Sequence, residues 1–327
     1  MRERIGYLDN AKGLLIILMV IAHIFVGGYV FDLIFNFHMM AFFFISGLLL
    51  SYTNTAQRPF VQILRSRLVT MGVPFLFFEL WGVALRILVF EEKLSAKGYV
   101  YNTLSLNFNN GAIMWFLVTL FFAEMLFFSL HKLTADRRIQ AAVSVLLFFV
   151  SLLIPTENPY LDYLGRILRA VFFLNVGYFL GKQFSVFRLP VLVISLLTLL
   201  LLTWFNGRIG FAEVTLSNCV FFLLTSFSGI YLTLSVAQMP LGKWLSILGK
   251  NTMTIYCTHF AYYVFIGKLL GNIDMGQQSF AHRCLIFLLV ALLEIPTIYL
   301  FNRFFPILVG KKRRPSTSHT AERRDSI

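Results

Sequence analysis

Long apolar segments, separated by short polar and basic stretches, occupy almost the whole chain. Ten of them are long enough to cross about 30 Å of hydrocarbon as helices. Their approximate limits are residues 13–31, 37–53, 69–90, 113–130, 141–155, 165–181, 189–205, 215–237, 252–270 and 284–308. The pattern predicts an all-α polytopic membrane protein, a bundle of about ten transmembrane helices.

Composition supports this class and excludes a soluble domain. The 327 residues are 58% hydrophobic and only 13% charged, against about 25% charged residues in an average soluble protein. The three cysteines lie within apolar segments and form neither a CxxC motif nor a Cys/His pairing. A disulfide framework and a zinc site are therefore not indicated, and we expect no metal.

The net charge of +13 does not indicate a nucleic-acid-binding protein, because the basic residues lie between apolar segments rather than on one solvated face. An even number of spans places both termini on one side of the membrane. Basic residues concentrate at the N-terminus, in alternate loops and in the C-terminal tail, which predicts that both termini are cytoplasmic. We expect one integral membrane domain, residues 1–310, and a basic, disordered cytoplasmic tail, residues 311–327.

Ionisable residues inside apolar segments are the candidate functional positions, because burying them in a membrane is costly. They are His23, Glu79, Arg86, Glu124, Arg166, Arg169, His259, Glu294 and Arg303. We assign Glu124, Glu294 and His259 to packing or hydrogen bonding rather than catalysis. Arg166 and Arg169, one helical turn apart, either extend outward to the membrane surface or hold an anionic or sugar ligand.

The first apolar segment carries the most informative spacing. In a helix, Lys12 and His23 lie three turns apart on one face, with Asp9 close to that face and His23 roughly 16 Å beyond Lys12 along the axis. This places His23 near the middle of the membrane. An imidazole there suits proton transfer near neutral pH, and His38 follows in the second segment.

Two arginines, Arg65 and Arg67, follow the second apolar segment. We expect them in a cytoplasmic loop near the same membrane face as Lys12. Guanidinium and ammonium groups gathered there would suit a ligand that carries phosphate. Membrane topology alone would also account for basic residues at this position.

Several of these residues stand in blocks that resemble one family. The first blocks are Tyr7-Leu8-Asp9-x-x-Lys12-Gly13, the spacing from Lys12 to His23, and FHMMAFFFISG from Phe37 to Gly47. Later blocks are Trp115-Phe116-Leu117 and Asn251-Thr252-Met253-Thr254-Ile255-Tyr256, followed by His259. Together they resemble the membrane-bound acyltransferase 3 family over nearly the whole chain. The basic position of the first block is often arginine in that family, and Lys12 lacks the two-pronged geometry of a guanidinium.

The resemblance implies a fold of about ten helices in a bacterial cytoplasmic membrane. It implies transfer of an acyl group, often acetyl from acetyl-CoA, to hydroxyls of cell-envelope sugars. Lys12, His23 and the arginines after the second segment are the implied functional residues, together with His38. Asp9, Trp115, Arg166 and Arg169 are candidates for a supporting or acceptor-side role.

Our hypothesis is therefore a membrane O-acetyltransferase. Acetyl-CoA is a co-substrate that enters from the cytoplasm with its phosphates near Lys12, Arg65 and Arg67, and the acceptor is a glycan or a lipid-linked sugar. His23 acts as a general base or as a transient acyl carrier, and His38 orients the acceptor or relays the proton. The alternatives are a transporter or flippase that uses the same buried charges, and a structural assembly subunit.

Overall fold

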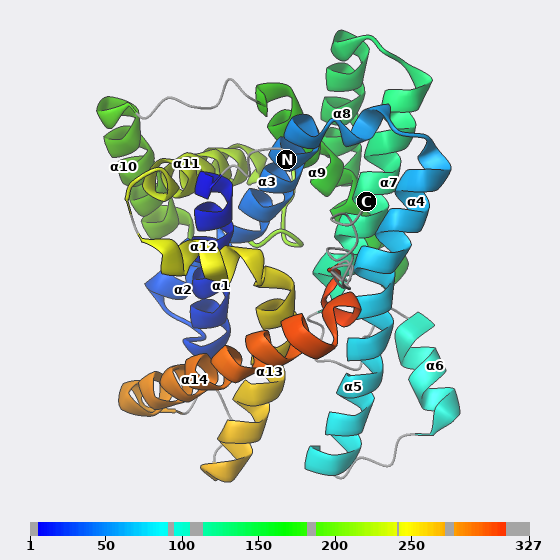
Figure 1. The fold of residues 1–327 in the computed structure, drawn as a ribbon. Helices are drawn as coiled ribbons and strands as arrows, with labels where there is room; N and C mark the ends of the chain where they lie inside the picture. Colours follow the sequence, from blue (N-terminus) through cyan, green and yellow to red (C-terminus); the bar gives the residue numbers. More distant parts are fainter. Residues whose placement is uncertain are drawn as a thin grey trace, which may run out of the picture.

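The structure is a computed structural model that describes residues 6–90, 95–104, 114–181, 188–240, 242–271 and 278–311. All regular secondary structure in these ranges is helical (Figure 1). The α-helices are α1 Gly6–Ile24, α2 Tyr29–Phe35, α3 His38–Thr53, α4 Phe60–Arg67, α5 Val73–Phe90, α6 Ala96–Leu104, α7 Trp115–Leu133, α8 Arg137–Ser151, α9 Pro159–Leu180, α10 Leu189–Asn206, α11 Cys219–Ala237, α12 Lys243–Lys250, α13 Thr252–Leu269 and α14 Phe280–Phe304. Short helical turns are η1 Thr55–Gln57, the π-helical η2 Leu68–Gly72 and η4 Pro306–Val309.

Eight helical segments in the described ranges are long and apolar enough to cross a membrane. They are Gly6–Ile24, Tyr29–Thr53, Phe60–Leu85, Trp115–Leu133, Pro159–Leu180, Leu189–Asn206, Cys219–Ala237 and Phe280–Phe304. The prediction of an all-α polytopic membrane protein is confirmed, whereas the count of ten is not. Of the two remaining segments, α8 has only 15 residues, and α13 contains three threonines, His259 and Lys268 among its 18 residues.

Two of the differences from the predicted segment boundaries affect the candidate site. Helix α1 ends at Ile24 rather than continuing to residue 31, because Gly27 and Gly28 adopt φ values of 84° and 83° that favour glycine. His23 therefore lies in the last turn of α1 and not in the middle of a span. The third segment begins at Phe60 rather than at residue 69. Arg67 is the last residue of α4, which continues through η2 into α5.

Glycines allow the helices that carry the candidate site to pack closely, as small residues do in membrane proteins. Gly13 of α1 packs against the carbonyl of Leu245 in α12, and Gly249 of α12 packs against the carbonyl of Asp9. The same reciprocal arrangement joins α3 and α9, where Gly47 lies against the carbonyl of Leu174. These contacts fix the positions of α1 and α3 in the bundle.

Side-chain hydrogen bonds connect the last described residue to α14 and to the start of α13. Lys311 donates through Nζ to the side-chain oxygens of Asn251 and Asn302, each at 2.5 Å. Asn302 donates in turn to Asn251 at 2.8 Å. Of the expected tail, residues 312–327 lie outside the described residues.

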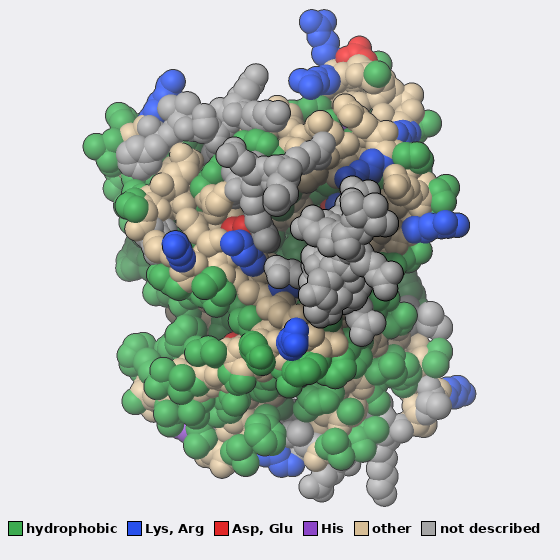
Figure 2. Space-filling model, in the orientation of Figure 1, with side chains coloured by type: hydrophobic (Ala, Val, Ile, Leu, Met, Phe, Trp, Pro, Cys, Tyr) green, Lys and Arg blue, Asp and Glu red, His purple; other side chains and the backbone are tan. Residues whose placement is uncertain are grey.

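The surface is divided by chemistry. Figure 2 shows hydrophobic side chains dominating the lower part of one face, while most of its visible Lys and Arg side chains lie higher up. Exposed hydrophobic side chains on α5, α10 and α14 include Leu88, Trp204 and Ile295. Such a surface suits hydrocarbon as its solvent.

Candidate active site

A cavity of about 130 Å³ follows one face of α1, and we call it the α1 cavity. Lys12, Ile16 and Met19 line it from α1, at the spacing of successive helical turns. The other walls come from α3, α7 and α13: Met39, Phe42, Ser46, Phe116, Leu117, Leu120, Thr252, Met253 and Tyr256. His23 is the next residue on the Lys12 face, one turn beyond Met19.

Three histidines from three helices come together beyond this cavity, and we call His23, His38 and His259 the histidine cluster. The rings of His23 and His259 lie 5.3 Å apart between centroids. The ring of Phe35 links His23 to His38, because its centroid lies 6.5 Å from that of the His23 ring and 5.1 Å from that of the His38 ring. Met39 adjoins His38, and Tyr256 precedes His259 by one turn. Each of the three helices that bear a member of the histidine cluster therefore also lines the α1 cavity.

Backbone carbonyls fix the tautomers of two members of the cluster. His38 Nδ1 donates to the carbonyl of Ile34 at 2.8 Å, and His259 Nδ1 donates to the carbonyl of Ile255 at 2.8 Å. A carbonyl only accepts, so Nδ1 carries the hydrogen and Nε2 of a neutral ring is left as an acceptor. Within the described residues, the buried Nε2 of His259 has no hydrogen-bond partner.

Lys12 is held by an acidic neighbour at the opposite end of the α1 face. Its ammonium lies 2.9 Å from Oδ1 of Asp9, and the Lys12 side chain is 19% exposed while Asp9 is buried. The two residues predicted to share this face therefore form an ion pair. A phosphate group bound at this position would share the Lys12 ammonium with the Asp9 carboxylate.

The two predicted donor-side arginines have different surroundings. Arg65 is exposed on α4, while Arg67 pairs with the buried carboxylate of Glu124 in α7 at 2.5 Å. Arg67 also lines a polar hollow of about 120 Å³ that we call the α4 pocket, together with Arg58 and Ser66. The structure places Lys12 and Arg67 in separate cavities rather than in one.

A second group of predicted residues does come together. The Arg166 guanidinium lies 5.2 Å from the ring centroids of both Trp115 and Tyr163 and bonds Asp162 at 2.5 Å. Phe211 stacks on Trp115 at 6.0 Å and lies 5.6 Å from the guanidinium of the buried Arg169. We call these six residues the arginine–aromatic cluster, and they combine charge, hydrogen-bonding groups and flat apolar faces.

Some residues of these sites were not selected from the sequence, namely His259, Arg58, Asp162, Tyr163 and Phe211. His259 was assigned to packing, although a histidine in an apolar segment was itself the available signal. Arg58 is one of the basic residues in the alternate loops that predict topology, and nothing in its spacing indicates a shared pocket with Arg67. Across the described residues, no group of three or more His, Cys, Asp or Glu side chains is arranged to hold a metal ion.

The sequence was compared with known families, curated proteins and solved structures. A family model described as an acyltransferase domain matches residues 5–300, which include the α1 cavity, the histidine cluster and the arginine–aromatic cluster. No curated protein and no solved structure matches the chain. With nearly its whole length matched by that model, the chain belongs to the acyltransferase 3 family of membrane acyltransferases.

Proposed function

We propose that this protein is an O-acyltransferase that moves an acetyl group from acetyl-CoA to a hydroxyl of a cell-envelope glycan or of its lipid-linked precursor. The observation that carries the proposal is the α1 cavity, whose lining on α1 runs from Lys12 to Met19, one helical turn before His23 of the histidine cluster. A bacterial cytoplasmic membrane is the setting that such an acceptor requires. The family supplies acyl transfer, and the cavity and histidines suggest how it is done.

The shape of the α1 cavity suits the thioester arm of the donor. Its polar lining residues are Lys12, Ser46 and Thr252, and the remainder is apolar or aromatic. At about 130 Å³ the cavity is smaller than the ~300 Å³ or more of a site that encloses a whole drug-sized ligand. The nucleotide end of CoA would remain outside it, and the α4 pocket with Arg58 and Arg67 provides cations for those phosphates.

The proposed chemistry needs one base and one leaving group. His23 takes the proton of the acceptor hydroxyl while that oxygen attacks the thioester carbonyl carbon. The carbon–oxygen bond forms, the carbon–sulfur bond breaks, and the CoA thiolate leaves. The proton held by His23 then passes to the thiolate, so that the products are an O-acyl ester and free CoA.

The other two histidines support this base. The ring of His259 lies 5.3 Å from that of His23, and its Nε2 has no partner among the described residues. We assign it to accepting a hydrogen bond from the His23 ring, which would hold the orientation of that ring. His38 begins α3, and we assign it to the acceptor hydroxyl or to proton relay. Both have tautomers set by backbone carbonyls, which keeps their acceptor atoms available.

The acceptor side is assigned to the arginine–aromatic cluster. Sugar rings bind flat aromatic faces, and Arg166 and Asp162 add hydrogen-bonding groups beside Trp115. The buried guanidinium of Arg169 adds positive charge, which favours a sugar that carries phosphate or carboxylate. The cluster contains Trp115, Arg166 and Arg169, three of the four residues that the sequence suggested for a supporting or acceptor-side role; the fourth, Asp9, pairs with Lys12.

Purified protein in lipid vesicles, supplied with acetyl-CoA labelled in the acetyl group and with envelope glycan fractions, tests the proposal. We expect label to move to an alkali-labile ester on the glycan and CoA to be released in equal amount. A transporter or a structural subunit would release no CoA. Label that becomes attached to the protein itself, on His23, would replace general-base catalysis with an acyl-enzyme route.

A further inference from the structure

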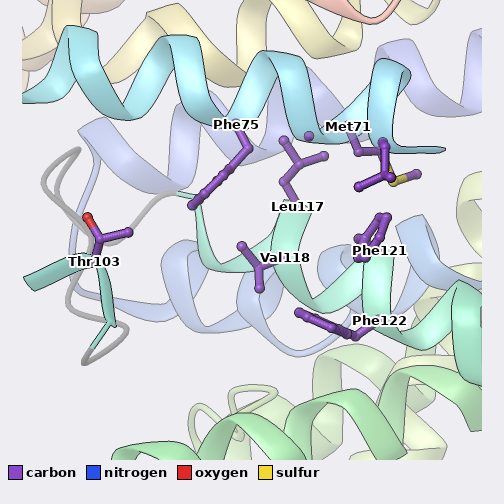
Figure 3. Close-up of a pocket in the computed structure, with 9 residues that line it drawn as sticks. Met71, Phe75, Thr103, Leu117, Val118, Phe121 and Phe122 are labelled. Carbon is purple, nitrogen blue, oxygen red and sulfur yellow. The ribbon is translucent and has the colours of Figure 1, made fainter. Parts of the chain in front are cut away.

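A larger and more apolar pocket lies on the other side of α7 from the α1 cavity, and we call it the α5–α7 pocket. Its volume is about 290 Å³. Figure 3 shows Met71 and Phe75 on one side facing Val118, Phe121 and Phe122 on α7, with Thr103 of α6 at the edge. None of the described residues that line it is charged, so this lining suits hydrocarbon and offers no cation to a phosphate.

One side chain belongs to both spaces. Leu117 lines the α1 cavity and also the α5–α7 pocket, and only 2% of its surface is exposed. The neighbouring positions on α7 line one space each. Val118 lines only the α5–α7 pocket, and Leu120 lines only the α1 cavity. Leu117 is thus the partition between them.

We propose that Leu117 determines the length of the acyl chain that the enzyme accepts, by closing the α1 cavity against the α5–α7 pocket. The proposal rests on the proposed function, in which the thioester arm of an acyl-CoA occupies the α1 cavity. With Leu117 in place, a leucine side chain closes the wall of the α1 cavity toward the α5–α7 pocket, and the cavity takes a short acyl group. Without it, the hydrocarbon of a longer acyl group can continue into the α5–α7 pocket.

The occupant of the enlarged space is the acyl chain of the donor, for two reasons. The pocket adjoins the donor cavity directly through Leu117, and its apolar lining gains from every methylene removed from water. A membrane lipid tail is the competing occupant, because Leu68 and Phe122 at the pocket are 48% and 50% exposed. A lipid tail that filled the pocket would leave no room for the acyl chain, so the experiment distinguishes the two.

The test measures binding of acyl-CoA analogues in which a thioether replaces the thioester, so that no transfer occurs. Acetyl- and hexanoyl-length analogues are compared on wild-type protein and on Leu117→Ala, both in lipid nanodiscs. Each methylene that becomes accommodated raises affinity about fourfold. We therefore expect the preference for the hexanoyl over the acetyl analogue to rise at least ~tenfold in Leu117→Ala.

Two substitutions on the same helix are the matched controls. Leu120→Ala removes the same atoms but leaves the partition in place, and Val118→Ala enlarges only the α5–α7 pocket. Neither should shift the chain-length preference in the way Leu117→Ala does. If Leu117→Ala is poorly folded, Leu117→Val should give a smaller shift in the same direction.

An unchanged preference in a folded Leu117 variant would overturn the proposal and leave a lipid tail as the occupant. An equal shift in Leu120→Ala would also overturn it, because the partition would then play no part. The proposed function is judged separately, by transfer from acetyl-CoA in the wild-type protein. If both analogues bind but no acetyl transfer occurs, the proposed function is contradicted, and the role of Leu117 in chain-length preference is still tested by the binding data. If neither analogue binds, both claims are contradicted.

Discussion

Lys12 and Asp9 form an ion pair, so a substitution of either residue should change the affinity for acetyl-CoA in a characteristic way. Lys12→Ala removes the cation at the mouth of the α1 cavity, and a charge-assisted hydrogen bond contributes about 1.5–3 kcal/mol. We expect the Kd for acetyl-CoA to rise roughly tenfold or more, with Lys12→Arg retaining most of the affinity. Isothermal titration on protein in nanodiscs measures this.

Asp9→Asn is the companion variant, because it leaves Lys12 in place and frees it from the carboxylate. Affinity should then stay equal or improve. If Lys12→Ala binds acetyl-CoA as tightly as the wild type, the role of Lys12 is to orient α1 through Asp9 and not to hold phosphate.

His259 allows a cleaner separation of positioning from packing. His259→Asn keeps a side-chain donor for the Ile255 carbonyl and removes the imidazole, with its Nε2 acceptor, whose ring lies 5.3 Å from that of His23. We expect kcat to fall about 10–100-fold with KM for acetyl-CoA nearly unchanged, and the dependence of kcat on pH to shift because His23 loses its neighbour. Equal kcat and an unchanged pH profile would return His259 to a packing role.

The sequence alone predicted part of this residue-scale arrangement. The helical period was enough to place Lys12 and His23 on one face, because both residues lie in α1. The approach of His259 to His23, and of Arg67 to Glu124, depends on how helices distant in the chain pack together. No spacing within either segment contains that information.

At the scale of elements, the glycine contact between α3 and α9 should control both stability and activity. A Cβ on Gly47 would meet the carbonyl of Leu174, so Gly47→Ala forces the helices apart. We expect a loss of about 1–3 kcal/mol in stability and lower activity, since α3 carries His38. Thermal unfolding in detergent, followed by tryptophan fluorescence, measures the first effect.

Gly72→Ala is the control for this packing. Its added Cβ would meet only the Leu68 side chain, at 3.8 Å, and alanine is the better helix former. Stability should be unchanged or slightly higher. Equal losses in the two variants would show that close packing is not what Gly47 provides.

Element boundaries were less predictable than the elements themselves. All ten apolar segments fall on helices, because continuous hydrophobicity is a strong signal for a membrane helix. The first boundary shifted because Gly27 and Gly28 break the helix within an apolar run. The third shifted because α4 continues into α5 through a π-helical turn, despite its polar and basic residues.

At the scale of the whole molecule, the distribution of basic residues predicts topology that the helices alone leave open. Reporter fusions after Arg138 and at the C-terminus should be cytoplasmic, and one after Gly210, between α10 and α11, should be outside. Activity of an alkaline phosphatase fusion paired with fluorescence of a GFP fusion at each site reads this out. A C-terminus on the outside would contradict the ten-span topology and donor entry from the cytoplasm.

The central claim is that acyl transfer occurs at His23, at the end of the α1 cavity. The most direct measurement is the rate of acetyl transfer by His23→Ala, compared with wild type at equal amounts of folded protein and with acetyl-CoA binding measured in the same samples. We predict a loss on the order of a hundredfold or more in kcat, with donor affinity retained. A His23→Ala protein that binds acetyl-CoA and acetylates its glycan at nearly the wild-type rate would contradict the account.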